Sequence, residues 1–155
     1  MNRDFVRPIS LYGVTGSGKT EVYMEMIARV LSEGRQAIVL IPEIALTYQT
    51  VMRFYTRFGE RVSILNSRMS QGERYDQMER VKKGEVDIMI GPRSALFTPF
   101  EKLGLIVIDE EHEPTYKSEQ VPRFMQERQQ SKGQGWKALV CTGVGNSIAG
   151  SILCM

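Results

Sequence analysis

Residues 13–20, GVTGSGKT, combine glycines, a lysine and a threonine at the spacing GxxxxGK[ST]. In such a loop the glycines let backbone N–H groups turn inward around a nucleotide phosphate, the lysine adds positive charge, and the threonine hydroxyl can bind Mg²⁺. A glycine turn that matches by accident is the alternative, but an apolar run before the loop and a helical pattern after it favour phosphate binding. The candidate phosphate ligands are Gly13, Thr15, Gly16, Ser17, Gly18, Lys19 and Thr20.

A second group of candidate residues follows the apolar run 105–108. Asp109 comes directly after that run, so we expect its carboxylate at the carboxyl edge of a sheet, where it can share Mg²⁺ with Thr20. Glu110 is then the candidate that orients and polarises the attacking water. A solvated acidic turn is the alternative, because Glu111 and Glu113 are acidic as well. The phosphate loop upstream favours the metal and water roles.

The whole chain has the composition of an ordinary globular domain. Its 155 residues are 42% hydrophobic and 25% charged, and the net charge is only +2, so composition alone indicates neither disorder nor a nucleic-acid binder. The two cysteines have no CxxC spacing and no histidine cluster, which leaves no basis for a zinc site or a disulfide framework. We expect a cytoplasmic protein, because the sequence has neither a signal peptide nor an apolar stretch long enough for a membrane helix.

The elements that must position these residues alternate along the chain. Mainly apolar runs at 9–12, 37–41, 61–65, 86–90 and 105–108 predict strands, and helical spacing predicts helices over 19–31, 45–58 and 71–83. Strands that are apolar throughout are buried on both faces, and each parallel crossover carries a helix. The pattern therefore predicts a three-layer α/β lobe with a mostly parallel sheet.

Several motifs together resemble the superfamily-two DNA helicases of the bacterial primosome, which restart stalled replication forks. The segments GVTGSGKTEVY, PEIALT, RSALFTPF and IVIDEEHEPTYK carry the resemblance, which extends over residues 8–123. It implies a P-loop NTPase lobe of the RecA-like kind. His112, the only histidine, would ordinarily be a surface or packing residue, but in the DEEH box the resemblance implies that it couples DNA to the ATP site. The candidate catalytic residues are Lys19, Asp109, Glu110 and His112.

The same resemblance implies the first motor lobe of an ATP-dependent 3′-to-5′ helicase. Its implied cofactors are ATP and Mg²⁺, with Thr20 and Asp109 on the metal, whereas zinc is expected only in a part of full-length relatives that this chain lacks. The implied partners are single-stranded or forked DNA and other replication-restart proteins, and no membrane. A second lobe would supply the arginine that stabilises transition-state charge. We therefore expect this chain to bind Mg-ATP, to hydrolyse it feebly at most, and not to unwind DNA.

Two loops that follow strands at one sheet edge are candidates for binding the DNA backbone. Thr47, Arg93 and Ser94 can hold phosphates there, although Thr47 can equally cap a helix and Arg93 can pair with an acid. Tyr116 and Lys117 lie in a segment that resembles the aromatic-rich coupling loop of related helicases, where an aromatic face beside a cation can stack on bases. Scattered exposed aromatics are also common, so these assignments depend on the resemblance.

The sequence changes character after Phe124, where a polar stretch precedes a glycine-rich end. Family members continue with a Tyr-x-Ala-Arg-Asp helix and a Ser-Ala-Thr motif, and this chain has neither. Read one nucleotide later, codons for residues 142–150 can spell Leu-Gly-Ser-Ala-Thr-Pro-Ser-Leu-Glu, so we hypothesise an out-of-frame tail that begins with another shift after Phe124. A genuinely divergent end is the alternative, and the coding DNA distinguishes the two. The predicted organisation is an ATP-binding lobe over 1–124 and a divergent tail over 125–155.

Two other functions fit the phosphate loop. The first is a P-loop kinase or metabolic NTPase that does not act on DNA. Such an enzyme would need an acceptor site and a lid, and the chain has no arginine-rich lid segment. A lobe that folds without binding nucleotide would be an inactive remnant. Nucleotide titration identifies the remnant, and stimulation of ATP hydrolysis by single-stranded DNA separates a helicase from a kinase.

Overall fold

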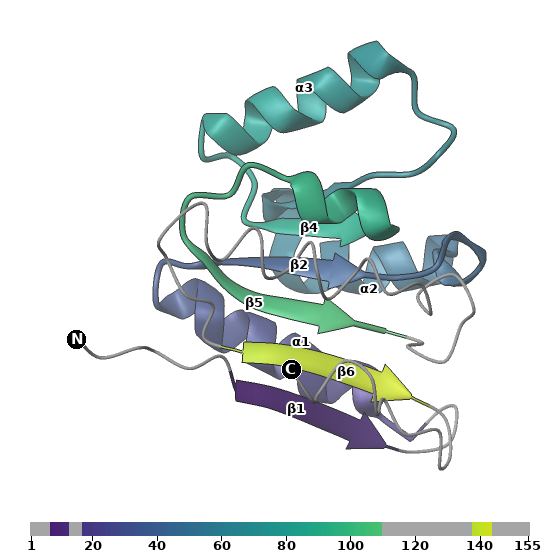
Figure 1. The fold of residues 1–155 in the computed structure, drawn as a ribbon, viewed down its shortest axis with the longest axis vertical. Coiled ribbons are helices and arrows are strands. Elements are labelled where there is room, and N and C mark those ends of the chain that lie inside the picture. The colour runs from purple at the N-terminus through teal and green to yellow at the C-terminus, as the bar shows by residue number, and fades with distance from the viewer. Residues whose placement is uncertain (1–6, 13–16, 110–137, 144–155) are drawn as a thin grey trace.

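The computed structural model describes residues 7–12, 17–109 and 138–143, and in these residues six strands form one sheet. The strand order is β1-β6-β5-β2-β4-β3, and every pair of neighbours is parallel (Figure 1). The strands are β1 (Arg7–Tyr12), β2 (Gln36–Leu40), β3 (Val62–Ile64), β4 (Ile88–Gly91), β5 (Leu103–Ile108) and β6 (Ala138–Gly143). The predicted parallel sheet is confirmed.

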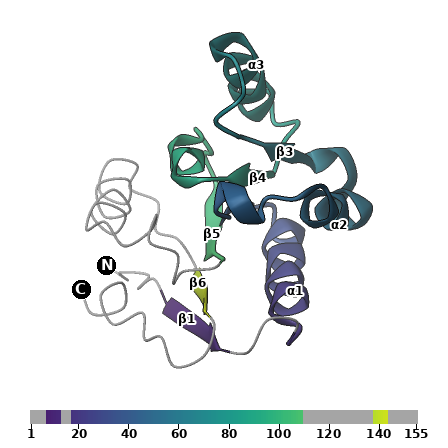
Figure 2. The ribbon, with the colours of Figure 1, turned by 90° about the vertical axis from the view of Figure 1, so that its right-hand side faces the viewer.

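Helical segments cover both faces of this sheet. Helices α1 (Lys19–Ser32) and α2 (Tyr48–Phe58) pack on one face (Figure 2). Helix α3 (Gln71–Lys82) and the 3-10 segment η3 (Arg93–Phe97) contribute to the core on the other face. The shorter 3-10 segments η1 (Glu43–Ala45) and η2 (Gly59–Arg61) precede α2 and β3 respectively. Within the described ranges, no helix has the length and apolar character needed to cross a bilayer.

The two cores follow from the alternation of side chains along each strand. In β2, Ala37 and Val39 pack with α1 and α2, whereas Ile38 and Leu40 pack with the α3 and η3 side. All four side chains are fully buried. Because successive side chains of a strand point to opposite faces, a strand covered on both sides must be apolar throughout. This is the reason that an apolar run without alternation predicted the three layers correctly.

Two predicted boundaries were wrong for identifiable reasons. Strand β5 begins at Leu103 rather than at residue 105, and it includes Gly104. A Cβ at Gly104 would lie 2.8 Å from Val30 Cγ1, so the glycine allows the strand to pass close to α1 and is not a strand terminator. The helix predicted from residue 45 begins at Tyr48, because Thr47 caps it and the separate 3-10 turn η1 precedes it.

The strand predicted over 86–90 lies over Ile88–Gly91, although Val86 is also fully buried. Asp87 is the residue directly before the strand. Its carboxylate accepts a hydrogen bond of 2.7 Å from Arg61 Nε, and its backbone N–H donates to the Arg61 carbonyl. These contacts join the start of β4 to the residue before β3.

Strand β6 was not predicted from the sequence, although Ala138 to Cys141 is an apolar run. It pairs with β1 over its six residues, from Arg7 opposite Ala138 to Tyr12 opposite Gly143, and with β5 on its other side. In the described residues β1 is joined to the sheet through this strand. The division of the chain near Phe124 stays a prediction.

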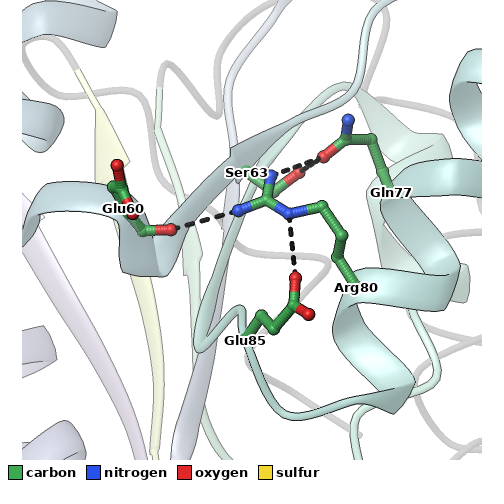
Figure 3. Close-up of polar contacts among 5 residues, drawn as sticks. All are labelled: Glu60, Ser63, Gln77, Arg80 and Glu85. Atoms are coloured by element: carbon green, nitrogen blue, oxygen red, sulfur yellow. Dashed lines mark hydrogen bonds and ion pairs between the residues drawn. The ribbon is translucent and has the colours of Figure 1, made fainter.

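A polar cluster holds α3 against the edge strand β3 (Figure 3). Gln77 Oε1 accepts hydrogen bonds from Ser63 Oγ at 2.6 Å and from Arg80 Nη1 at 3.2 Å. Arg80 also donates to the Glu60 carbonyl and to the Glu85 carboxylate, at 3.4 Å each. Ser63 is a buried polar residue of the sheet, and Gln77 supplies the hydrogen-bond partner that a buried hydroxyl needs.

Candidate nucleotide-binding site

The described end of the phosphate loop leads directly into α1. Gly18 has φ 82°, a left-handed conformation that suits glycine, and it is the residue that precedes the helix. Lys19 and Thr20 are the first two residues of α1 and are half-buried. Because α1 follows β1, its N-terminus lies at the carboxyl edge of the parallel sheet. The backbone N–H groups and positive dipole end of a helix start favour an anion at this position.

Asp109 lies at the same edge, directly after β5. Its backbone N–H donates to the Leu40 carbonyl at 2.8 Å, which fixes Asp109 against the end of β2. The carboxylate is half-buried and accepts a 2.9 Å hydrogen bond from the Tyr23 hydroxyl. Tyr23 belongs to α1, so this bond joins the helix that follows the phosphate loop to the end of β5.

Tyr23 is fully buried and also hydrogen-bonds to the Thr20 side chain. Burial raises the pKa of the Tyr23 hydroxyl far above its usual range, and the negative charge of Asp109 raises it further. The bond with Thr20 lowers this pKa by a smaller amount. The phenol therefore stays protonated and can donate to Asp109. Its ring stacks on Phe54 of α2, with centroids 6.3 Å apart and an interplanar angle of 20°.

The oxygen atoms of this site fit a magnesium ion that arrives with a nucleotide. Thr20 offers a hydroxyl and Asp109 a carboxylate, and both are hydrogen-bonded to one phenol. Mg²⁺ usually takes one or two protein oxygens and completes its octahedron with phosphate and water. Among the described residues no group of three or more histidine, cysteine or acidic side chains forms a metal site.

The structure places the first group of predicted DNA contacts at this carboxyl edge, each with a structural role. Thr47 is exposed and caps α2, since its Oγ1 accepts from Thr50 N at 3.3 Å. Arg93 and Ser94 are half-buried and begin η3, which the bond from Ala95 N to the Pro92 carbonyl closes at 2.9 Å. Contact with DNA at these residues stays a prediction.

Glu43 connects two loops at this edge, and sequence reasoning missed it. Its carboxylate accepts hydrogen bonds from the Ser67 hydroxyl, at 2.8 Å, and from the Ser67 backbone N–H. The hydroxyl bond is the main reason that the pKa of Glu43 lies below its usual range, and the backbone bond adds to the effect. The glutamate lies in the PEIALT segment, but no local pattern indicates a serine 24 residues away.

Several predicted site residues lie outside the described residues. They are Gly13, Thr15, Gly16, Glu110, His112, Tyr116 and Lys117. Of the predicted phosphate ligands, the structure describes the four from Ser17 to Thr20. It brings Thr20 and Asp109 together through Tyr23, a residue that the sequence analysis did not select. The only available signal was its position one helical turn after Thr20.

Comparisons with known proteins agree with this arrangement. The chain matches the DEAD/DEAH box helicase family over residues 2–140. It is 54% identical over 114 residues to the replication restart protein PriA of Bacillus subtilis (strain 168), which covers 74% of this chain and 14% of that protein.

Two solved structures have a similar fold. The DUF1998 helicase MrfA bound to DNA matches with a TM-score of 0.70 and 22% identity, over 93% of this chain and 21% of that one. RecG bound to a three-way DNA junction matches with a TM-score of 0.65 and 25% identity, over 95% and 20%. The chain spans about a fifth of these relatives' length or less. The likeness to replication-restart helicases and the RecA-like lobe are both confirmed.

Proposed function

This chain belongs to the DEAD/DEAH box helicase family, and from that premise we propose that it is the ATP-binding motor lobe of a 3′-to-5′ DNA helicase that acts in replication restart. The observation that carries the proposal is the position of Lys19 and Thr20 at the start of α1, with Asp109 joined to that helix through Tyr23. The similarity to PriA supports replication restart as the process. A cytoplasmic location belongs to the same proposal.

The proposal gives each candidate site residue a separate part in nucleotide binding. The N-terminus of α1 and the Lys19 ammonium neutralise phosphate charge, and Gly18 allows the backbone to enter the helix from the loop. Thr20 and Asp109 hold Mg²⁺, which when bound neutralises charge between the phosphates. Glu110 orients the attacking water, and His112 couples the site to DNA. Gly13, Thr15, Gly16 and Ser17 supply the rest of the phosphate loop.

DNA contact is a further part of the proposal. Thr47, Arg93 and Ser94 hold backbone phosphates at the carboxyl edge, and Tyr116 stacks on bases beside the positive charge of Lys117. The DNA complexes of MrfA and RecG support a fold of this kind acting on DNA. The partners are single-stranded or forked DNA and other replication-restart proteins.

Activity of this chain alone should stop at binding. Hydrolysis by a helicase occurs between two lobes, and an arginine of the second lobe stabilises the charge of the transition state. This chain spans 14% of the Bacillus subtilis relative. We expect saturable Mg-ATP binding, at most feeble hydrolysis and no unwinding.

The test is a titration of the purified chain with a fluorescent ATP analogue and Mg²⁺. Lys19→Ala should weaken binding about tenfold or more, because it removes a charge from the phosphates. Lys83→Ala, a change at the exposed C-terminus of α3, should leave affinity unchanged. Equal affinities for wild type and Lys19→Ala would contradict the proposal, and absence of binding by wild type would identify an inactive remnant.

The kinase alternative needs a second measurement. ATP hydrolysis by a full-length relative should rise when single-stranded DNA is added, because DNA binding and hydrolysis are coupled in a helicase motor. A rate of ATP hydrolysis that stays the same when DNA is added would favour a kinase or metabolic NTPase.

A further inference from the structure

Tyr23 is placed between two groups that lie far apart in the sequence. Its hydroxyl donates to Asp109 Oδ2 at 2.9 Å, across 86 residues of sequence, and it hydrogen-bonds to Thr20 within the same helix. Thr20 begins α1, whereas Asp109 follows β5, and strand β6 separates β5 from β1 in the sheet. Thus one phenol joins the first turns of α1 to the residue that follows β5.

The ring of Tyr23 cannot move freely, so its hydroxyl has a fixed position. The side chain has no exposed area, and Phe54 of α2 stacks on it at 6.3 Å. Met24, Ile27 and Phe54 belong to the same buried core. A buried hydroxyl that made no hydrogen bond would be unfavourable, so the phenol is required to keep its two partners.

The direction of the two hydrogen bonds suits metal binding. The phenol has one proton, and it donates this proton to Asp109 Oδ2. In its hydrogen bond with Thr20 the phenol oxygen therefore accepts, so the Thr20 hydroxyl donates to Tyr23 and keeps its lone pairs for another partner.

From this geometry we infer that Tyr23 is a positioning residue, which orients the Thr20 hydroxyl and the Asp109 carboxylate as a pair before Mg-nucleotide binds. The inference rests on the proposed function, because it assigns Thr20 and Asp109 to the metal. Tyr23 itself touches neither nucleotide nor metal. Without the Tyr23 hydroxyl, the Asp109 carboxylate and the Thr20 hydroxyl lose the partner that they share. More of their ordering then has to occur when Mg-nucleotide binds, which weakens binding.

The variant that tests this inference is Tyr23→Phe, which keeps the ring and removes only the hydroxyl. Affinity for a fluorescent ATP analogue is measured once in Mg²⁺ and once in EDTA, for the wild type and the variant. We expect Kd in Mg²⁺ to rise about fivefold to tenfold and Kd in EDTA to stay within about twofold. Tyr55→Phe, which removes a hydroxyl from half-buried Tyr55 of α2, is the matched control and should change neither value.

A second measurement needs no nucleotide and so separates this inference from the proposed function. Urea unfolding of the metal-free protein is compared for wild type, Tyr23→Phe, Asp109→Ala and the double variant. If the hydroxyl and the carboxylate act on each other, the double variant should lose less stability than the sum of the single losses.

Three results would overturn the inference. The first is a Tyr23→Phe protein whose affinity gain from Mg²⁺ equals that of the wild type. The second is an equal loss of affinity in Mg²⁺ and in EDTA, which would indicate a general structural effect. The third is strict additivity in the unfolding cycle. By contrast, absence of nucleotide binding by the wild type, together with non-additive unfolding, would refute the proposed function while Tyr23 still held Asp109.

Discussion

At the scale of single residues, the close approach of two backbone segments requires glycine at position 91. Gly91 ends β4 beside Leu65, which follows β3. An added Cβ would lie 2.7 Å from the Leu65 carbonyl oxygen and 3.1 Å from the Leu65 Cβ. Both contacts involve atoms that a side-chain rotation cannot remove. Gly91 therefore permits the hydrogen bond from Leu65 N to the Ile90 carbonyl at 2.8 Å.

We expect Gly91→Ala to lower the free energy of unfolding by about 1–3 kcal/mol, because the methyl group forces the ends of β3 and β4 apart. Urea denaturation followed by circular dichroism measures the change.

Gly72→Ala is the control for this prediction. Gly72 lies in the first turn of α3, and its added Cβ would meet only Ser70 Oγ, at 3.9 Å. There alanine should be neutral or stabilising by up to about 1 kcal/mol, because it restricts the unfolded chain. A Gly91→Ala protein as stable as Gly72→Ala would show that the edge has more room than the structure indicates.

At the scale of elements, the carboxyl edge of the sheet is held together by contacts between loops. Glu43 in η1, after β2, accepts two hydrogen bonds from Ser67, after β3. Strand β4 lies between β2 and β3, so this contact crosses over the end of one strand. The residues that it orders adjoin Thr47, which we propose as a DNA contact.

The Glu43 contact predicts a pH dependence of stability. The folded-state pKa of Glu43 lies below its ordinary value of 4.5, so the unfolded chain binds the proton more tightly. The contribution of the contact is therefore complete above about pH 4.5 and is lost as pH falls through the lower folded-state pKa. Urea midpoints measured from pH 7 down to about pH 3 should fall less steeply for Glu43→Gln than for wild type.

The control for the pH series is Glu101→Gln, which removes an exposed carboxylate before β5. Its midpoints should follow the wild-type curve. If Glu43→Gln and Glu101→Gln gave the same acid dependence, the contact with Ser67 would not contribute measurably to the folded state.

At the scale of the whole molecule, β6 unites the sheet. It pairs with β1 on one side and with β5 on the other, and the phosphate loop follows β1 directly. The relative position of β1 and of Asp109 after β5 therefore depends on a strand from far along the chain.

Removal of β6 should consequently unfold the lobe. We expect a chain that ends at residue 137 to lose more than about 5 kcal/mol, which is comparable to the whole stability of a small domain, because β1 and β5 both lose their partner. Far-UV circular dichroism and urea titration provide the measurement. A chain that ends at residue 143 retains all six strands and serves as the control. Equal unfolding midpoints for the two chains would show that β6 is dispensable.

The sequence by itself determined the layered fold and the chemistry of the site. Apolar runs without alternation specified strands buried on both faces, and the loop at 13–20 with Asp109 after such a run predicted phosphate and metal ligands. These features are local. The burial of a strand and the ability of a helix N-terminus to bind phosphate both depend on residues that are neighbours in the sequence.

Only the tertiary structure decided which distant residues meet. Tyr23 hydrogen-bonds to Asp109 across 86 residues of sequence, and Ser67 hydrogen-bonds to Glu43 across 24. Strand β6, which begins at residue 138, lies between β1 and β5 in the sheet. Hydroxyls and carboxylates have no sequence period that reveals a distant partner, and the order of strands in a parallel sheet need not follow their order along the chain. Packing of the sheet and helices brings these groups together.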